Sequence, residues 1–258
     1  MNTEKNKTPL AGLREKLKKE TEKTEILLGS IPATVTTLFV VSVICMNLLA
    51  NKTIVQTRWI ALDGGVLISW PSFMCMDMIT GYFGHKASNR IALLAALINL
   101  LTSAVFFLAA SIPSDAADYT ALNSILGGTW FILLGSTVAF LSSAAINNIL
   151  NHLISRLFKK DALGPRAFAV RSYVSTFIGQ FCDNFIFSVI VFVFFAPIFW
   201  DGFHWTVLQC TLCALTGACA ELVMEVAFSP IAYRILKKWR RQKIGTAYLE
   251  YMEQNGGN

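Results

Sequence analysis

The chain has 258 residues, of which 54% are hydrophobic and only 15% are charged, and its formal net charge is +6. This composition excludes an ordinary soluble domain and is typical of a membrane protein. The positive charge does not indicate a nucleic-acid-binding protein, because the basic residues lie in tails and short loops without interleaved aromatic residues.

Residues 1–30 are rich in Lys and Glu, and Leu10, Leu13 and Leu17 have the spacing of a short amphipathic helix. We expect a charged, partly helical cytoplasmic segment that lies on the membrane surface at most. The segment is too acidic for a transit peptide, and the apolar run after it lacks a small-residue cleavage site. We therefore expect no cleavable signal.

Six apolar runs follow, each long enough to cross a bilayer as a helix. They cover residues 31–50, 66–83, 91–112, 122–150, 173–199 and 206–235. The sequence thus predicts an all-α integral membrane protein with a six-helix domain over residues 31–235, followed by a basic cytoplasmic tail over 236–258. The first three runs are near the 20 residues that a span needs, whereas the last three have 27 to 30, so those helices must tilt or project from the hydrocarbon.

The distribution of Lys and Arg predicts the orientation of the chain. The N-terminal segment, the second loop, the fourth loop and the C-terminal end hold seven, two, five and six of them, whereas the other three loops hold only Lys52 and Arg58. Basic residues concentrate on the cytoplasmic side of membrane proteins. Both termini are therefore predicted to be cytoplasmic.

The second run carries groups that lipid does not tolerate. Residues 64–84 include Pro71, Trp70 and the carboxylate of Asp77. A proline leaves a backbone carbonyl unpaired, and an acid at the middle of a membrane costs about 2.5–3.5 kcal/mol. This segment is therefore expected to face protein or a water-filled cavity and to form one wall of a substrate site.

Four carboxylates lie within the predicted spans: Asp77, Asp183, Glu221 and Glu225. Buried separately they would cost together roughly 10–14 kcal/mol, so they are expected to converge, pair, line water or be protonated. Glu221 and Glu225 share one helix face because they are four residues apart. Asp77 and Asp183 are the stronger functional candidates.

Other polar and aromatic residues accompany these acids. Gln180 and Asn184 flank Asp183, while Asn51 ends the first span. Trp70 and Phe73 are close enough in sequence to Asp77 to stack on a flat ligand. For each of these residues taken alone, interhelical hydrogen bonding or packing is the expected role, and a part in binding rests on their convergence with the acids.

The sequence shows no pattern typical of an enzyme or a metal protein. The six cysteines lie in apolar runs, and the Cys210–Cys213 pair has no second pair or histidine to complete a metal site. There is no zinc-protease, serine-hydrolase or nucleotide-binding motif. We expect no catalytic activity, no metal and no cofactor.

Residues across most of the chain, from about Asn47 to Tyr233, resemble those of the vitamin-uptake-like transporter family, also known as the queuosine precursor transporters. The resemblance rests on their order and spacing: Ala50-Asn51-Lys52, Pro71 with Asp77 and Gly84, the basic segment around Arg90, Ser136, Phe140 and Asn147, Ser175 with Gln180 and Asp183, and Pro230 with Tyr233.

The resemblance implies a secondary transporter that imports a 7-deazaguanine-type base or a related planar, vitamin-like solute across the bacterial inner membrane. In this reading Asp77 or Asp183 accepts two parallel hydrogen bonds from a guanine-like edge. Asn51, Gln180 or Asn184 donates to the ring carbonyl, and Trp70 or Phe73 stacks on the ring. Glu221 and Glu225 pair with a cationic substituent or carry coupling protons.

The sequence departs from the family pattern at three ionisable positions. It has Gly81, Phe131 and Glu221 where the family usually has an acid or base, an Arg and a Lys. Three questions stay open: the base carried, proton coupling, and whether the unit is a homodimer. The alternatives are a substrate-binding subunit that needs a separate energising module and, from another class, a membrane enzyme or assembly factor.

Overall fold

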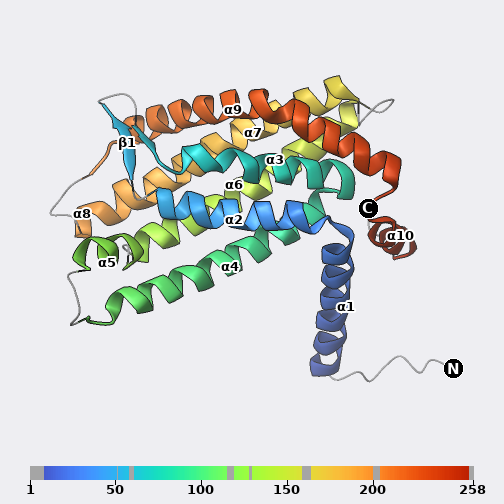
Figure 1. Ribbon diagram of the computed structural model, residues 1–258, viewed down its shortest axis with the longest axis horizontal. Coiled ribbons are helices and arrows are strands. Elements are labelled where there is room, and N and C mark those ends of the chain that lie inside the picture. The colour runs from blue at the N-terminus through green and yellow to red at the C-terminus, as the bar shows by residue number, and fades with distance from the viewer. Residues whose placement is uncertain are drawn as a thin grey trace.

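A computed structural model describes residues 9–50, 52–57, 61–114, 119–127, 130–158, 164–199 and 204–255. Within these ranges the long helices lie lengthwise side by side (Figure 1). They are α2 (Ala33–Leu49), α3 (Val66–Phe83), α4 (His85–Ser111), α6 (Trp130–Leu157), α7 (Pro165–Ser188) and α9 (Val207–Gln242). The π-helical segment η1 (Val189–Phe195) and α8 (Ala196–Phe199) continue α7.

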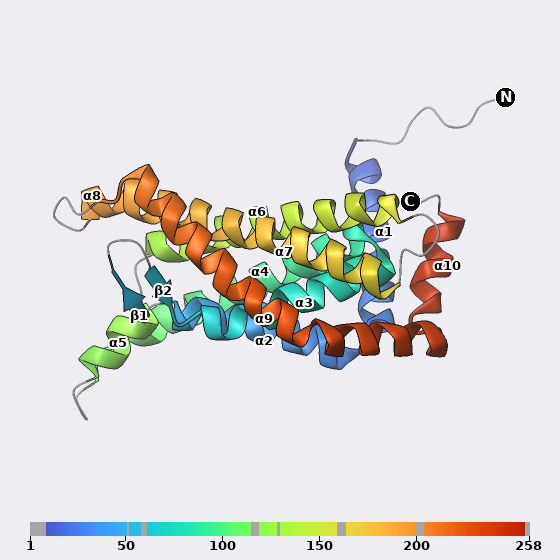
Figure 2. The ribbon, with the colours of Figure 1, turned by 90° about the horizontal axis from the view of Figure 1, so that it is seen from above.

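The shorter elements gather at the two ends of the bundle. One end carries α1 (Pro9–Ser30), the C-terminal part of α9 and α10 (Thr246–Gln254), and the other carries α5 (Thr120–Gly127) and α8 (Figure 2). The second end also carries an antiparallel hairpin of β1 (Thr53–Gln56) and β2 (Ala61–Asp63). The sequence predicted an all-α protein, and this hairpin is too short to show in a hydropathy pattern.

Helix bounds differ from the predicted spans where polar residues extend a helix. The α4 helix begins at His85, six residues before the predicted start, because Gly84 at a φ of 89° makes the turn after α3 and the basic segment is already helical. The α7 helix likewise begins at Pro165 rather than at residue 173, and proline suits a first helical position. Residues 122–150, expected as one helix, are divided between α5 and α6.

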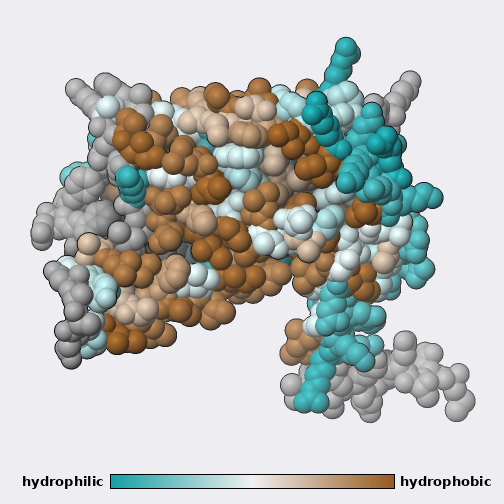
Figure 3. Space-filling model, in the orientation of Figure 1, coloured by the Kyte–Doolittle hydropathy of each residue, from teal (hydrophilic) through white to brown (hydrophobic). Residues whose placement is uncertain are grey.

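The outer surface of the bundle is apolar. Leu101 and Val223, on α4 and α9, are each 67% exposed, and hydrophobic residues cover the middle of the molecule, with hydrophilic ones at the end that carries α1 (Figure 3). In the described ranges, three helices are long and apolar enough to cross a membrane, or four if α1 and α2 count as one bent span. The fold is that of an all-helical membrane protein with a small hairpin.

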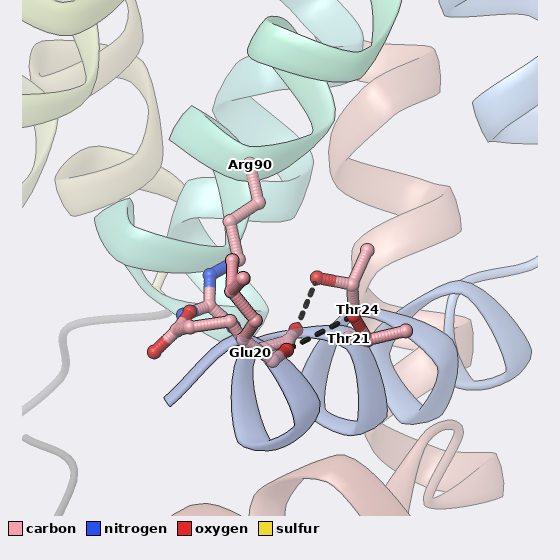
Figure 4. A network of polar contacts seen from close by, with 5 residues as sticks. Glu20, Thr21, Thr24 and Arg90 are labelled. Atoms are coloured by element: carbon pink, nitrogen blue, oxygen red, sulfur yellow. Dashed lines mark hydrogen bonds and ion pairs between the residues drawn. The ribbon is translucent and has the colours of Figure 1, made fainter. Parts of the chain in front are cut away.

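Helix α1 projects from the bundle (Figure 1), and the chain bends by 105° between it and α2. Glu20 of α1 pairs with Arg90 near the start of α4 (Figure 4). Partial burial here, together with the neighbouring Arg90 cation, lowers the pKa of Lys23. A bend of this size is compatible with the predicted helix on the membrane surface, which stays a prediction.

Two of the long helices contain a proline, and in each the residue before it repairs the backbone. Proline at position i cannot donate to the carbonyl of residue i−4. In α3, Pro71 frees the carbonyl of Leu67, which accepts from the indole nitrogen of Trp70 at 3.1 Å. In α9, Pro230 frees the carbonyl of Val226, which accepts from the hydroxyl of Ser229 at 3.3 Å.

Helix α3 lies inside the bundle, and every residue from 71 to 80 is buried. It contacts α2, α4, α6, α7 and α9. Apolar side chains such as Met76, Met78 and Ile79 fill most of its surface, so the polar groups of α3 are enclosed by protein as expected.

Close helix packing around Gly179 of α7 gives a first prediction. A Cβ at this glycine would lie 3.0 Å from the Cβ of Asn147 and 3.3 Å from a ring carbon of Phe73, so α6 and α3 both approach its backbone. We expect Gly179→Leu to destabilise the fold by about 1–3 kcal/mol, the usual cost of overpacking. Thermal unfolding in detergent checks this.

The control is Gly29→Leu, because nothing lies within 4 Å of a Cβ at Gly29 in α1. An unfolding temperature for Gly179→Leu that is no lower than that of the control contradicts the packing described here.

Candidate functional site

Asp77 is fully buried in the bundle and accepts four hydrogen bonds from two other helices. The amide nitrogens of Asn147 and Asn151 of α6 lie 3.0 and 2.8 Å from Oδ1. The hydroxyls of Ser172 and Thr176 of α7 donate to Oδ2, and the Thr176 oxygen lies 3.3 Å from it. The two residues of each pair are four positions apart in the sequence, so both project from the same face of their helix.

A second acid approaches the same serine from α9. The hydroxyl of Ser172 lies 2.6 Å from Oε1 of Glu225, whose side chain is fully buried. Ser172 therefore joins carboxyl groups from α3 and α9, and acids that are 148 positions apart in the sequence meet in one place.

Arg171 supplies the positive charge of this region. Its side chain is only 1% exposed, and it attracts Asp77. The guanidinium fills the space beside Gly81, where a Cβ would lie 2.4 Å from Nη2. Gly81 is one of the positions where the resembled family has an ionisable residue, and here a cation from α7 occupies that space instead.

Several buried polar atoms around Asp77 and farther along α7 have no hydrogen-bond partner among the described residues. They are Oδ1 of Asn147, Oδ1 of Asn151, Oε2 of Glu225, both polar side-chain atoms of Gln180 and the amide nitrogen of Asn184. Buried polar atoms are normally bonded to protein, water or a ligand. We call the buried cluster that includes most of these atoms the polar core, defined as Asp77, Asn147, Asn151, Arg171, Ser172, Thr176, Gln180 and Glu225.

Asp183 and Glu221, two of the predicted acids, lie apart from Asp77. Asp183 is half-buried and accepts from Ser143 of α6 at 2.9 Å. It follows Thr176 by seven residues on α7, about two helical turns or 10 Å along the axis. Glu221 is buried one turn before Glu225 and accepts from Ser69 of α3 at 2.6 Å.

The structure gives the predicted aromatic and amide residues definite neighbours. Trp70 stacks on Phe228 of α9 with 3.8 Å between ring centroids, so one face of its indole is covered. Phe73 is fully buried against Gly179. The amide of Asn184 lies against Gly217 of α9. Asn51 lies outside the described residues.

The partners of Asp77 are not apparent from the sequence alone. Asn151, Ser172 and Thr176 resemble any polar residues in or near a span, and Arg171 is one of the five basic residues counted in the predicted fourth loop. The signal that could have found them is Pro165 after Gly164, a helix start that places Arg171 two turns inside α7. From that start, Ser172 and Thr176 follow on one face.

Part of the chain that includes this site matches the model of a known protein family. The model of a family described as "Putative vitamin uptake transporter" matches residues 63–235, which is two thirds of the chain and includes the polar core. The chain belongs to this family. It is therefore a multi-pass plasma-membrane protein of a transporter family rather than of an enzyme family.

A protein of Bacillus subtilis (strain 168) named "Probable queuosine precursor transporter" is 28% identical over 159 residues. The match covers 60% of this chain and 66% of the length of that relative, slightly less than two thirds. No solved structure matches the chain. The predicted resemblance to the family is confirmed.

Proposed function

We propose that this transporter imports a 7-deazaguanine-type base, a queuosine precursor, or a related planar solute, without a separate energising subunit. The observation that carries the proposal is the buried polar core with its unpartnered amide and carboxyl atoms. Buried polar atoms without a partner make the bundle less stable, because each costs free energy unless a partner forms a hydrogen bond with it. Packing of the helices therefore does not explain them. The family match and the named relative support the same reading.

We assign recognition of the base to one face of α7. Gln180, Asp183 and Asn184 lie within one helical turn, and the two amides have buried atoms without a described partner. A carboxylate accepts two parallel bonds from the ring N–H and exocyclic amine of a guanine-like edge, and an amide nitrogen donates to the ring carbonyl. Asp183 and its flanking amides offer both.

Asp77 has another role in this proposal. A carboxylate has about four acceptor sites, and the four donors around Asp77 occupy them. Asp77 therefore organises α3, α6 and α7, and exchanges a donor only when the helices move. Glu221 and Glu225 of α9 are the coupling residues, and Trp70 contributes its uncovered indole face to stacking.

The test is uptake by this chain alone. Cells that can neither make nor import the base are given the gene, and the modified nucleoside in their tRNA is measured after the base is added. We expect modification to depend on the gene. Failure in a host without any energising module, with success when such a module is present, would favour the binding-subunit alternative.

A binding measurement complements the uptake test. The purified protein is heated with purines, 7-deazapurines and water-soluble vitamins, and its unfolding temperature is recorded. A ligand at 100 times its dissociation constant adds about 2.7 kcal/mol to stability, which shifts unfolding by several degrees. Stabilisation by vitamins alone would reassign the substrate.

The proposed orientation has six crossings, by α2, α3, α4, α6, the α7–η1–α8 helix and α9, with both termini in the cytoplasm. The end with α1 and α10 carries most of the described basic residues, which supports a cytoplasmic position for it. We expect an impermeant maleimide to label Ser114→Cys, at the other end, in intact cells and to label Lys16→Cys only after permeabilisation.

The unaltered chain is the control for labelling, since its six cysteines all lie in helices α2, α3, α7 and α9. Labelling of Lys16→Cys in intact cells contradicts the orientation.

A further inference from the structure

The hydroxyl of Ser172 takes part in two hydrogen bonds with carboxyl groups. Its oxygen is within bonding reach of Oδ2 of Asp77 and of Oε1 of Glu225. A hydroxyl has a single proton to donate, and an ionised carboxylate can only accept. A hydroxyl that makes two full hydrogen bonds donates one and accepts the other, so this arrangement fits one protonated acid that donates to Ser172.

The surroundings of the two acids decide which of them holds the proton. Asp77 receives donors from Asn147, Asn151, Ser172 and Thr176 and is attracted to Arg171, a set that suits an ionised carboxylate. Glu225 has Ser172 as its described hydrogen-bond partner, and no ion pair of the described residues includes it. The proton therefore belongs to Glu225.

Charge balance leads to the same assignment. With Arg171 cationic, Asp77 anionic and Glu225 neutral, the polar core carries no net charge. With both acids ionised it would carry one uncompensated negative charge in the interior of a membrane protein, which is costly. The amide nitrogens of Asn147 and Asn151 face Asp77, which suits an ionised carboxylate at this position.

We propose that Glu225 is the binding site for one proton that drives import, and that Ser172 relays this proton to Asp77. In the relay the Oε1 proton of Glu225 passes to the Ser172 oxygen while the Ser172 proton passes to Oδ2 of Asp77, so the serine is unchanged. This inference rests on the proposed transport function and adds its energy source.

Other titratable or charged groups face this pair from the packed helices. Arg171 and Tyr173 lie on α7, Cys75 on α3 and Glu221 on α9. Tyr173 bonds to Ser229 at 2.7 Å and Glu221 bonds to Ser69, so each has a partner away from Ser172. Gln180 lies one turn after Thr176, and its unpartnered amide extends the polar core along α7 toward Asp183.

The experiment uses the full-length protein in liposomes with radiolabelled 7-cyano-7-deazaguanine as the probe. With an outside-acid pH gradient we expect at least tenfold accumulation, loss of accumulation with a protonophore, and no change when sodium replaces potassium. In Glu225→Gln, which imitates the protonated acid, gradient-driven accumulation disappears while exchange of labelled for unlabelled base across the membrane continues.

Serine variants test the relay. Ser172→Ala should slow gradient-driven uptake about tenfold or more, and Ser172→Thr, which keeps the hydroxyl, should restore most of it. Ser72→Ala is the matched control, because this buried serine of α3 bonds to the backbone carbonyl of Ser69 and not to an acid. Glu22→Gln, at an exposed glutamate of α1, controls for loss of a carboxylate.

The outcomes separate the two proposals. Uptake by the unaltered protein that ignores the pH gradient, or that needs sodium, overturns the proton site and leaves the transport function standing. No uptake at all overturns both. Accumulation by Glu225→Gln equal to that of the unaltered protein also overturns the proton site. If that variant does not fold, the comparison of Ser172→Ala with Ser172→Thr decides.

Discussion

Cells that depend on an external 7-deazaguanine base should lose at least 99% of their uptake when Asp183 or Asp77 is replaced by Asn. In Asp183→Asn the carboxylate that accepts two bonds from the base becomes an amide with one acceptor oxygen. The new amide N–H group then faces an N–H donor of the base. A site built to hydrogen-bond a substrate discriminates by factors of 10⁴ or more when that match is lost. In Asp77→Asn the donors of α6 and α7 lose their common anion.

Binding distinguishes the two variants. The base should no longer raise the unfolding temperature of Asp183→Asn. It should still stabilise Asp77→Asn, because Asp77 bonds to four donors of the protein and not to the base. Glu22→Gln is the control for loss of an acid at an exposed position. Normal uptake by both aspartate variants would refute the proposed site.

The second large effect is expected on stability. Replacing Arg171 by Gln removes the buried cation that attracts Asp77 and that lies over the ring of Phe168, 5.4 Å from its centroid. Breaking a buried pair from one side usually costs about 3–5 kcal/mol, because a buried charge is left uncompensated. We expect a large fall in the unfolding temperature of the purified protein.

The matched control is the double variant Arg171→Gln with Asp77→Asn, which removes both charges. Its stability should exceed that of Arg171→Gln alone, although it should not transport. Coupling of this sign shows that the two residues interact. If the double variant is less stable than Arg171→Gln, the two side chains do not compensate each other and the assigned charge balance is wrong.

Much of the bundle was predictable because lipid imposes a simple rule on the sequence. Long apolar runs located the central parts of α2, α3, α4, α7 and α9, and the second run matched α3 to the residue. Ends were less predictable, since polar stretches such as His85–Arg90 are helical without being hydrophobic. The division of residues 122–150 into α5 and α6 has no hydropathy signal.

The acids were identifiable as candidates because each is costly in a membrane, but their partners were not. Ser172 and Thr176 resemble any polar residues at the start of a helix, and only their contact with α3 and α9 gives them meaning. Arg171 looked like a loop cation because basic residues near span ends normally are. Its burial depends on the space left by Gly81, a relation between two helices that one sequence does not show.

The two proline sites lie next to each other, because the ring of Trp70 beside Pro71 stacks on that of Phe228 close to Pro230. At both sites a side chain replaces a backbone amide as donor, and a side chain can release a carbonyl without unwinding the helix. Pro71 of α3 and Pro230 of α9 therefore lie at one level of the bundle, tied by the stacked rings. We expect a bend at one proline to be passed to the other helix through this stack, and so to alter the distance between Asp77 and Glu225, which lie six and five residues from these prolines.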